Sequence, residues 1–127
     1  MRTEQPEIFI TRSQQKNLKK LIAEAFRLKD RIAPFLSAEV RRAAICTDDA
    51  LPENVVAPDR SISYRLDWGP PTRHRTLVYP QNFTSERTQI SLLSPIGAAL
   101  LGLRKGNQIH VFLPGSGFHK LCVTDVR

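Results

Sequence analysis

The segment from Ser91 to Ile109, SLLSPIGAALLGLRKGNQI, decides the fold of this chain. Its apolar residues at positions 96, 99, 100 and 103 follow the spacing of one buried helix face. Ser94 can cap this helix because its hydroxyl can accept from a free backbone N–H, and Pro95 suits the first helical position. Gly102 or Gly106 can supply the left-handed residue that ends the helix. The segment therefore predicts a strand, a short helix and a returning strand.

The rest of the C-terminal part predicts strands. Residues 61–68 alternate polar and apolar side chains, which places Ile62, Tyr64, Leu66 and Trp68 on one face. Further strands are expected at residues 74–79, 88–93, 108–113 and 118–126. The helix at residues 94–103 lies between the strand at residues 88–93 and the strand at residues 108–113. This order favours a twisted antiparallel sheet covered by one short helix, which is an α+β arrangement.

Two short helices are expected in the N-terminal third. Thr11 and Gln14 have the spacing of a capping box, and apolar residues recur at helical spacing from Leu18 to Leu28. A second helix should begin near Pro34 and reach about Ile45. Two short helices with a tight link form a helical hairpin.

The remaining segments suggest a division into two parts. Residues 1–10 are expected to be a loose lead-in, and residues 47–58, which contain acids and prolines, a linker. We therefore expect a helical hairpin over residues 1–47 and a C-terminal domain over residues 48–127.

Charge is concentrated at one end of the chain. The 127 residues carry a formal net charge of +7, and the segment from Arg12 to Arg42 holds nine basic and three acidic residues. This excess favours contact with a polyanion or an acidic protein surface; a solvated helical face is the alternative. No apolar stretch approaches the roughly 20 residues that cross a bilayer, and no secretory segment is visible. We therefore expect a cytoplasmic protein that makes no membrane contact.

The sequence offers no pattern of catalytic or metal-binding chemistry. Cys46 and Cys122 stand far apart, which excludes a zinc ribbon, and the histidines lack the spacing of metal ligands. Nucleotide-binding loops and a nucleophile elbow are also missing. We expect no metal, no cofactor, no catalytic residue and no enzymatic activity.

Two blocks of the sequence carry a resemblance to a known family. Leu77-Val78-Tyr79-Pro80 and the segment from Ser94 to Gly106 resemble the C-terminal domain of the bacterial Gre transcript-cleavage factors. The match is closer to their short relatives of the Rnk type, called regulators of nucleoside diphosphate kinase, and covers roughly Val55 to Arg127. The resemblance implies an FKBP-like C-terminal domain, an N-terminal helical hairpin and RNA polymerase as the partner.

The hairpin tip departs from the Gre pattern. In Gre factors two acidic residues at the tip of a long hairpin hold a catalytic Mg²⁺ inside RNA polymerase. Here the expected tip, with Arg27, Lys29, Asp30 and Arg31, holds one carboxylate among cations. A helix of ~16 residues projects only about 24 Å, which is much shorter than a Gre hairpin. The resemblance thus implies a factor that does not stimulate transcript cleavage.

The loop before the C-terminal helix is the second implied site. In Gre factors this loop carries an acid-Ser-Pro triplet, and it helps the factor to dock on the rim of the polymerase secondary channel. This chain has Leu93, Ser94 and Pro95, so the serine and proline match and the acid does not. A plain helix cap is the alternative, and it is compatible with docking.

Together with the short hairpin, the resemblance implies a regulator that binds RNA polymerase near the secondary channel and competes with Gre factors, and a monomer is expected. The basic hairpin should reach inward and can also make weak, non-specific contact with nucleic acid. Two alternatives stay open: a cleavage-stimulating factor of Gre type, and an FKBP-like prolyl isomerase. A link to nucleoside diphosphate kinase follows from the family name alone.

Overall fold

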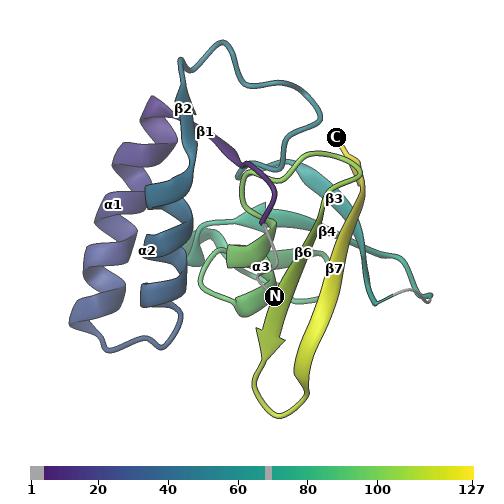
Figure 1. Cartoon of the computed structure of the whole chain (residues 1–127). Helices are drawn as coiled ribbons and strands as arrows, with labels where there is room; N and C mark the ends of the chain where they lie inside the picture. The colour runs from purple at the N-terminus through teal and green to yellow at the C-terminus, as the bar shows by residue number, and fades with distance from the viewer. Residues whose placement is uncertain (1–4, 68–69) are drawn as a thin grey trace.

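The computed structural model describes residues 5–67 and 70–127, so Trp68 lies outside the described residues. A pair of antiparallel helices stands beside a curved sheet, and a short helix lies between them (Figure 1). The α+β class expected from the sequence is therefore confirmed. Among the described residues, no helix is long and apolar enough to cross a bilayer.

The helical pair consists of α1 (Arg12–Arg27) and α2 (Ala33–Arg42). The predicted capping box starts α1, because the Gln14 N–H donates to Thr11 Oγ1 (3.1 Å) and the Thr11 N–H donates to Gln14 Oε1 (2.9 Å). The buried side of α1 carries Leu18, Ile22 and Ala25, as its periodicity predicted.

The expected lead-in over residues 1–10 is wrong at its last two residues, its residues 1–4 lie outside the described residues, and the expected end of the second helix is also wrong. Phe9–Thr11 forms strand β1, and Ala44–Cys46 forms strand β2, which pairs with it in parallel. Ile10, opposite Ile45 in this pair, is fully buried, and so is Ile8. Burial of these two side chains and the strand pairing end α2 at Arg42, so Ile45 is not helical.

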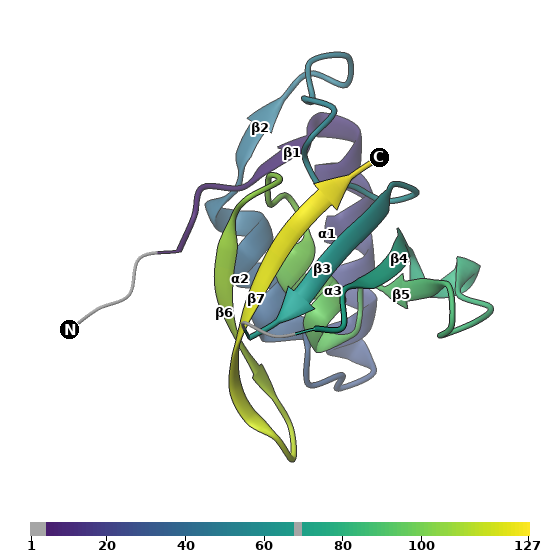
Figure 2. The same ribbon diagram turned by 90° about the vertical axis from the view of Figure 1, so that its right-hand side faces the viewer.

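The main sheet has the strand order β5-β4-β3-β7-β6 (Figure 2). Its strands are β3 (Ser61–Leu66), β4 (Arg73–Val78), β5 (Gln89–Ser91), β6 (Gln108–Leu113) and β7 (Gly117–Val126). Three of the pairs are antiparallel, but β4 and β5 run in parallel, so a wholly antiparallel sheet was the wrong expectation. The cause is the connection after β4, where a 3₁₀ turn (Pro80–Asn82) and a loop return the chain before β5 begins.

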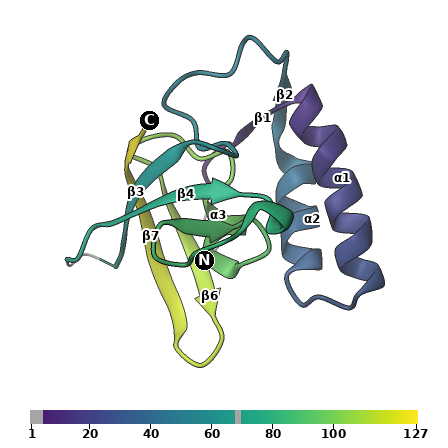
Figure 3. The ribbon, with the colours of Figure 1, turned by 180° about the vertical axis from the view of Figure 1, so that it is seen from behind.

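Helix α3 (Pro95–Leu100) lies between the sheet and the helical pair (Figure 3). It ends at Gly102, whose φ of 78° is the left-handed conformation that glycine adopts readily. Gly102 also contacts β1, since the Phe9 N–H donates to the Gly102 carbonyl oxygen at 3.1 Å. Of the two glycines predicted to stop the helix, Gly102 therefore does so.

One hydrophobic cluster joins the helical pair to the sheet. It contains residues of β1, α1 and α2 together with residues of α3 and the main sheet. Among its fully buried members are Ile10, Leu18, Leu36, Leu100 and Leu121. The boundary after residue 47 stays a prediction, but α1 and α2 are held against the sheet by shared apolar contacts.

Candidate functional site

The loop before α3 is built around the Ser94 hydroxyl. Ser94 Oγ accepts from the Gly97 N–H (3.0 Å) and donates to the Ser91 carbonyl oxygen (2.7 Å). The Leu93 N–H donates to Ser91 Oγ at 3.1 Å. The predicted N-cap is thus confirmed, and the hydroxyl is engaged inside the loop. The side chains of Leu93 and Pro95 are half-buried, and Leu93 packs in part against the hydrophobic core.

The structure brings Leu93, Ser94 and Pro95 together at one cleft, here called the sheet cleft. It has a volume of about 470 Å³ and lies over the β5 side of the sheet. Tyr64 lines it, and burial raises the pKa of this phenol. The other lining residues are mostly apolar or uncharged and include Phe83, Gln89, Ile90, Ile96 and Leu113, with Arg75 and Glu86 at the edge.

A second cleft lies on the other side of Pro95. This tip cleft has a volume of about 560 Å³ and is formed by four segments that are distant in the sequence. Gln5 comes from the segment before β1, Arg31 and Ile32 from the turn into α2, Phe35 from the first turn of α2, and Pro95 from the start of α3. The others come from β6, β7 and their turn: His110, Val111, Phe112, Pro114 and Phe118. The α1–α2 loop and the β6–β7 turn lie at the same end of the molecule (Figures 1 and 3).

The aromatic wall of the tip cleft was not predicted. Phe112 is 55% exposed and Phe118 is 77% exposed, and their rings meet edge to face at 5.1 Å. The sequence contained one signal: Ile109 and Val111 point inward, so Phe112 falls at an outward position where alternation calls for a polar residue.

The hairpin tip uses two of its four predicted residues internally. Asp30 Oδ1 accepts from the Ile32 N–H at 3.0 Å, which holds the turn into α2. Arg27 Nε donates to Glu24 Oε2 at 2.9 Å, and this bond lowers the pKa of the Glu24 carboxyl. Lys29 and Arg31 are exposed, and neither has an ion-pair partner among the described residues. The tip therefore presents the cations Lys29 and Arg31, and its one carboxylate is engaged.

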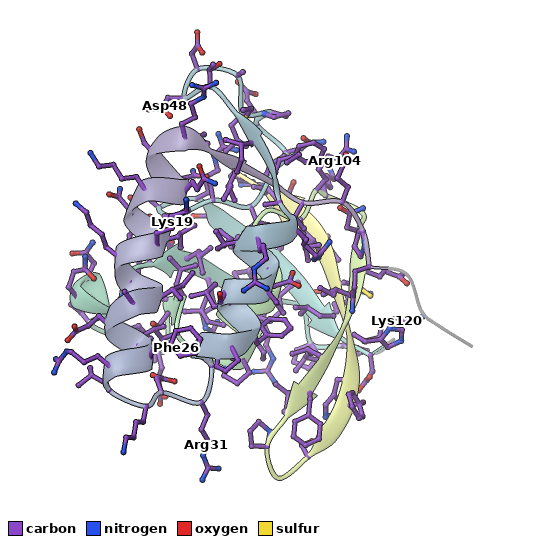
Figure 4. The ribbon with its side chains drawn as sticks, turned by 60° about the vertical axis from the view of Figure 1, so that its left-hand side comes forward. Lys19, Phe26, Arg31, Asp48, Arg104 and Lys120 are labelled. Atoms are coloured by element: carbon purple, nitrogen blue, oxygen red, sulfur yellow. The ribbon has the colours of Figure 1, made fainter. Side chains whose placement is uncertain are left out.

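Two apolar side chains are exposed beside these cations. Phe26 is 50% exposed and Leu28 is 63% exposed, although helical spacing had placed Leu28 on the buried side. Leu28 follows the last residue of α1 as its C-cap, so the helical periodicity no longer applies there. Phe26 and Arg31 lie at the same end of the helical pair, and Asp48 lies at the other end (Figure 4).

The acidic residues after the hairpin do not complete a metal site at the tip. Asp48 accepts from the Ser13 N–H (3.1 Å) and from the Ser13 hydroxyl, and these bonds lower the pKa of its carboxyl. They attach the segment after β2 to the start of α1. Among residues 5–67 and 70–127, no group of three or more His, Cys, Asp and Glu side chains could hold a metal ion.

A Ser–His–Asp series lies on the β6–β7 turn. His119 Nδ1 is 2.9 Å from Asp67 Oδ2, and Ser116 Oγ is 2.7 Å from His119 Nε2. The bond from His119 lowers the pKa of the Asp67 carboxyl. Nucleophilic catalysis also needs donors for an oxyanion beside the serine. Ser116 lies on an exposed turn, and we assign the series the role of joining this turn to the end of β3.

Known proteins resemble the chain in two ways. The family model for the GreA/GreB transcription elongation factor C-terminal domain matches residues 51–127. The regulator of nucleoside diphosphate kinase from Escherichia coli (strain K12) is 45% identical over 84 residues, which are 66% of this chain and 62% of that protein. The match thus spans less than two thirds of the curated relatives' length.

Solved structures extend the likeness to the helical pair. The prokaryotic transcription elongation factor GreA/GreB from Nitrosomonas europaea is 30% identical, has a TM-score of 0.75, and matches over 96% of this chain and 98% of its own. Gfh1 of Thermus aquaticus, at 17% identity and a TM-score of 0.50 over 95% of this chain and 98% of its own, shares the fold alone. The family model covers more than half of the sequence, so this chain belongs to the GreA/GreB transcription elongation factor family.

Proposed function

We propose that this chain is a transcription regulator that binds RNA polymerase near the secondary channel and competes with Gre factors without stimulating transcript cleavage. The observation that carries the proposal is the chemistry of the hairpin tip. Its one carboxylate, Asp30, is engaged with the Ile32 N–H, and the neighbouring charged groups are cations. A single carboxylate with one oxygen already engaged offers few of the hard oxygen ligands that Mg²⁺ prefers, which supports the proposal.

The length and packing of the hairpin support the same proposal. Helix α1 has 16 residues, which correspond to about 24 Å. Both helices lie along the side of the sheet, and the loop between them ends short of the β6–β7 turn (Figure 1). A tip in this position occupies space at a docking site, but it does not extend far into a channel.

The loop at residues 93–95 is proposed as the anchor. Its conformation is fixed by the two hydrogen bonds of Ser94, so its surface is pre-organised for a partner. Pro95 lines both the sheet cleft and the tip cleft, which makes it the centre of the apolar surface available for docking.

The first experiment measures binding of the chain to core RNA polymerase, with a Gre factor added as competitor. We expect binding at low salt and displacement by the Gre factor, since both should occupy one site. Binding that a saturating Gre factor leaves unchanged would contradict the shared site. Absence of binding at low salt would contradict polymerase as the partner.

A second experiment tests the expected lack of chemistry. Stalled elongation complexes incubated with the chain should show no cleavage above background, and Gre-stimulated cleavage should fall as the chain is added. A proline-peptide isomerisation assay should likewise show no acceleration. Activity in either assay would replace the proposal with one of the two enzymatic alternatives.

The proposal includes the cellular context. We propose that the chain acts as a monomer in the cytoplasm and that its contact with nucleic acid is weak and sensitive to salt. The Escherichia coli relative is named for nucleoside diphosphate kinase. For this chain we propose that any effect on that kinase arises indirectly, through transcription.

A further inference from the structure

The tip cleft combines an apolar surface with one sign of charge. Its walls carry Phe35, Phe112, Phe118 and two prolines, and its charged or titratable groups are Arg31 and His110. Among residues 5–67 and 70–127, no carboxylate lines it. Solvent-exposed aromatic residues gathered around a cleft are typical of protein interaction sites.

Arg31 gives the cleft a preference for negatively charged partners. It is exposed and has no ion-pair partner within the part of the chain that the structure describes. A partner carboxylate placed at the rim would pair with this guanidinium, which matches carboxylates bidentately. A basic partner would meet like charge instead.

We propose that the tip cleft binds an acidic, amphipathic segment of RNA polymerase, which packs a bulky apolar side chain against the paired rings of Phe112 and Phe118 and places a carboxylate on Arg31. This inference rests on the proposed function and adds to it the contact that the sequence did not predict. The docking surface then extends from the loop at residues 93–95 across Pro95 to the β6–β7 turn. The short hairpin is essential to it, because the start of α2 forms one wall.

A protein segment fits this cleft better than a nucleic acid. A phosphate backbone is held by several cations spaced along a groove, and the lining here supplies one guanidinium beside an imidazole. Peptide recognition by an apolar groove with a charged rim needs one or two bulky anchors and a matching charge. The cleft offers both.

The first test compares the affinity of variants for core RNA polymerase. Phe118→Ser should weaken binding at least about tenfold, since exposed aromatic anchors are common hot spots. Its 77% exposure means that folding should be unaffected, which a thermal melt will verify. Ile45→Ser is the matched control, because Ile45 is 38% exposed on a different part of the surface and should leave affinity unchanged.

A second pair of variants tests the charge. Arg31→Glu should weaken binding at least about tenfold, whereas Arg41→Glu, which changes the net charge equally from an exposed site on α2, should have a much smaller effect. Equal losses for the two variants would show that only the overall charge matters and would overturn the proposed contact.

Photo-crosslinking identifies the occupant. Phe118→p-benzoylphenylalanine in the complex with polymerase should crosslink to a segment that contains apolar and acidic residues. Crosslinks to nucleic acid, to a basic segment or to nothing would overturn the inference. If the unsubstituted chain binds and competes with a Gre factor but Phe118→Ser and Arg31→Glu bind equally well, the inference fails and the proposed function stands. If the unsubstituted chain does not bind, both fail.

Discussion

Gly97 lies so close to Ser91 that a Cβ atom added to it would be 1.9 Å from the Ser91 carbonyl oxygen. That oxygen also accepts from Ser94 Oγ, and the Gly97 N–H donates to the same hydroxyl. The absence of a side chain at Gly97 therefore allows the loop at residues 93–95 to fold back on Ser91. The proposed docking surface depends on this close approach.

Gly97→Ala should lower the free energy of unfolding by about 3 kcal/mol, because the atoms in the way belong to the backbone and cannot turn aside. In an open helical position the same change stabilises by about 0.5–1 kcal/mol, so the sign tests the contact. Urea unfolding of the variant and of the unsubstituted chain measures this change in the free energy of unfolding. Gly115→Ala is the comparison: its φ of 81° is strained in alanine but no atom lies within 4 Å of the new Cβ, and it should cost about 1–2 kcal/mol.

Arg42→Ala should lower the free energy of unfolding by about 2 kcal/mol, because buried Glu39 would lose both of its donors. Arg42 donates to the Glu39 carboxylate through Nε (3.0 Å) and Nη2 (2.8 Å), and its Nη1 donates to the Pro6 carbonyl oxygen at 2.6 Å. Arg41→Ala, on the exposed face, should cost less than about 0.5 kcal/mol. A double variant, Glu39→Met with Arg42→Met, should recover most of the loss, since no buried charge remains. Equal costs for both arginines would disprove the assignment.

The stability of the chain should depend on Asp48 in acid. Hydrogen bonds from Ser13 lower the pKa of this carboxyl in the folded protein, so its contribution is fully present above the ordinary value of 3.8. The contribution is lost as the pH falls from 3.8 through the lowered folded pKa. Melting temperatures measured against pH should therefore show that Asp48→Ala is less stable than the unsubstituted chain at neutral pH and that the difference shrinks in acid. Ser13→Ala should reproduce this behaviour; a difference that is constant with pH would contradict it.

Mg²⁺ should not bind the hairpin tip. Asp30 holds the turn into α2, so Asp30→Ala should destabilise the chain by about 1 kcal/mol, as loss of a cap does. If Asp30 were a metal ligand instead, Mg²⁺ would raise the melting temperature of the unsubstituted chain and not that of the variant. We expect millimolar Mg²⁺ to affect the two proteins equally.

Features fixed by neighbours in the sequence could be predicted, and features fixed by distant partners could not. The Thr11–Gln14 box, the Ser94 cap and the Gly102 stop are local hydrogen bonds and backbone conformations, and each was found where expected. Strand β1 was missed because its partner, β2, lies beyond both helices. Ile45 could equally extend a helix or begin a strand on its local pattern, and only pairing with Ile10 decides it.

The candidate site also has one part that is fixed by neighbouring residues and one part that is fixed by distant segments. The loop at residues 93–95 was predicted from its own residues, whereas the tip cleft assembles Arg31, Pro95 and Phe118 from three separate segments. No local pattern can indicate that the start of α2 and the β6–β7 turn share one end of the molecule. The exposed phenylalanines become informative once the fold places them together.

Variants of the exposed residues Phe26 and Leu28 can distinguish binding to polymerase from inhibition of Gre-stimulated cleavage. They lie at the tip but line neither cleft, so the double variant Phe26→Ser with Leu28→Ser should bind polymerase with little change in affinity. If the tip reaches inward, this variant should nevertheless be a weaker inhibitor of Gre-stimulated cleavage than the unsubstituted chain at equal occupancy. Because both side chains are half exposed or more, its melting temperature should stay within a few degrees.

The matched control is Ile45→Ser, which removes an exposed apolar side chain remote from the tip and should inhibit like the unsubstituted chain. Inhibition is measured in stalled complexes at concentrations that give the same bound fraction of each variant. Unchanged inhibition by the tip variant would mean that occupation of the docking surface by the loop and the tip cleft is sufficient for competition. The hairpin would then act only as a wall of the cleft, with no inward reach of its own.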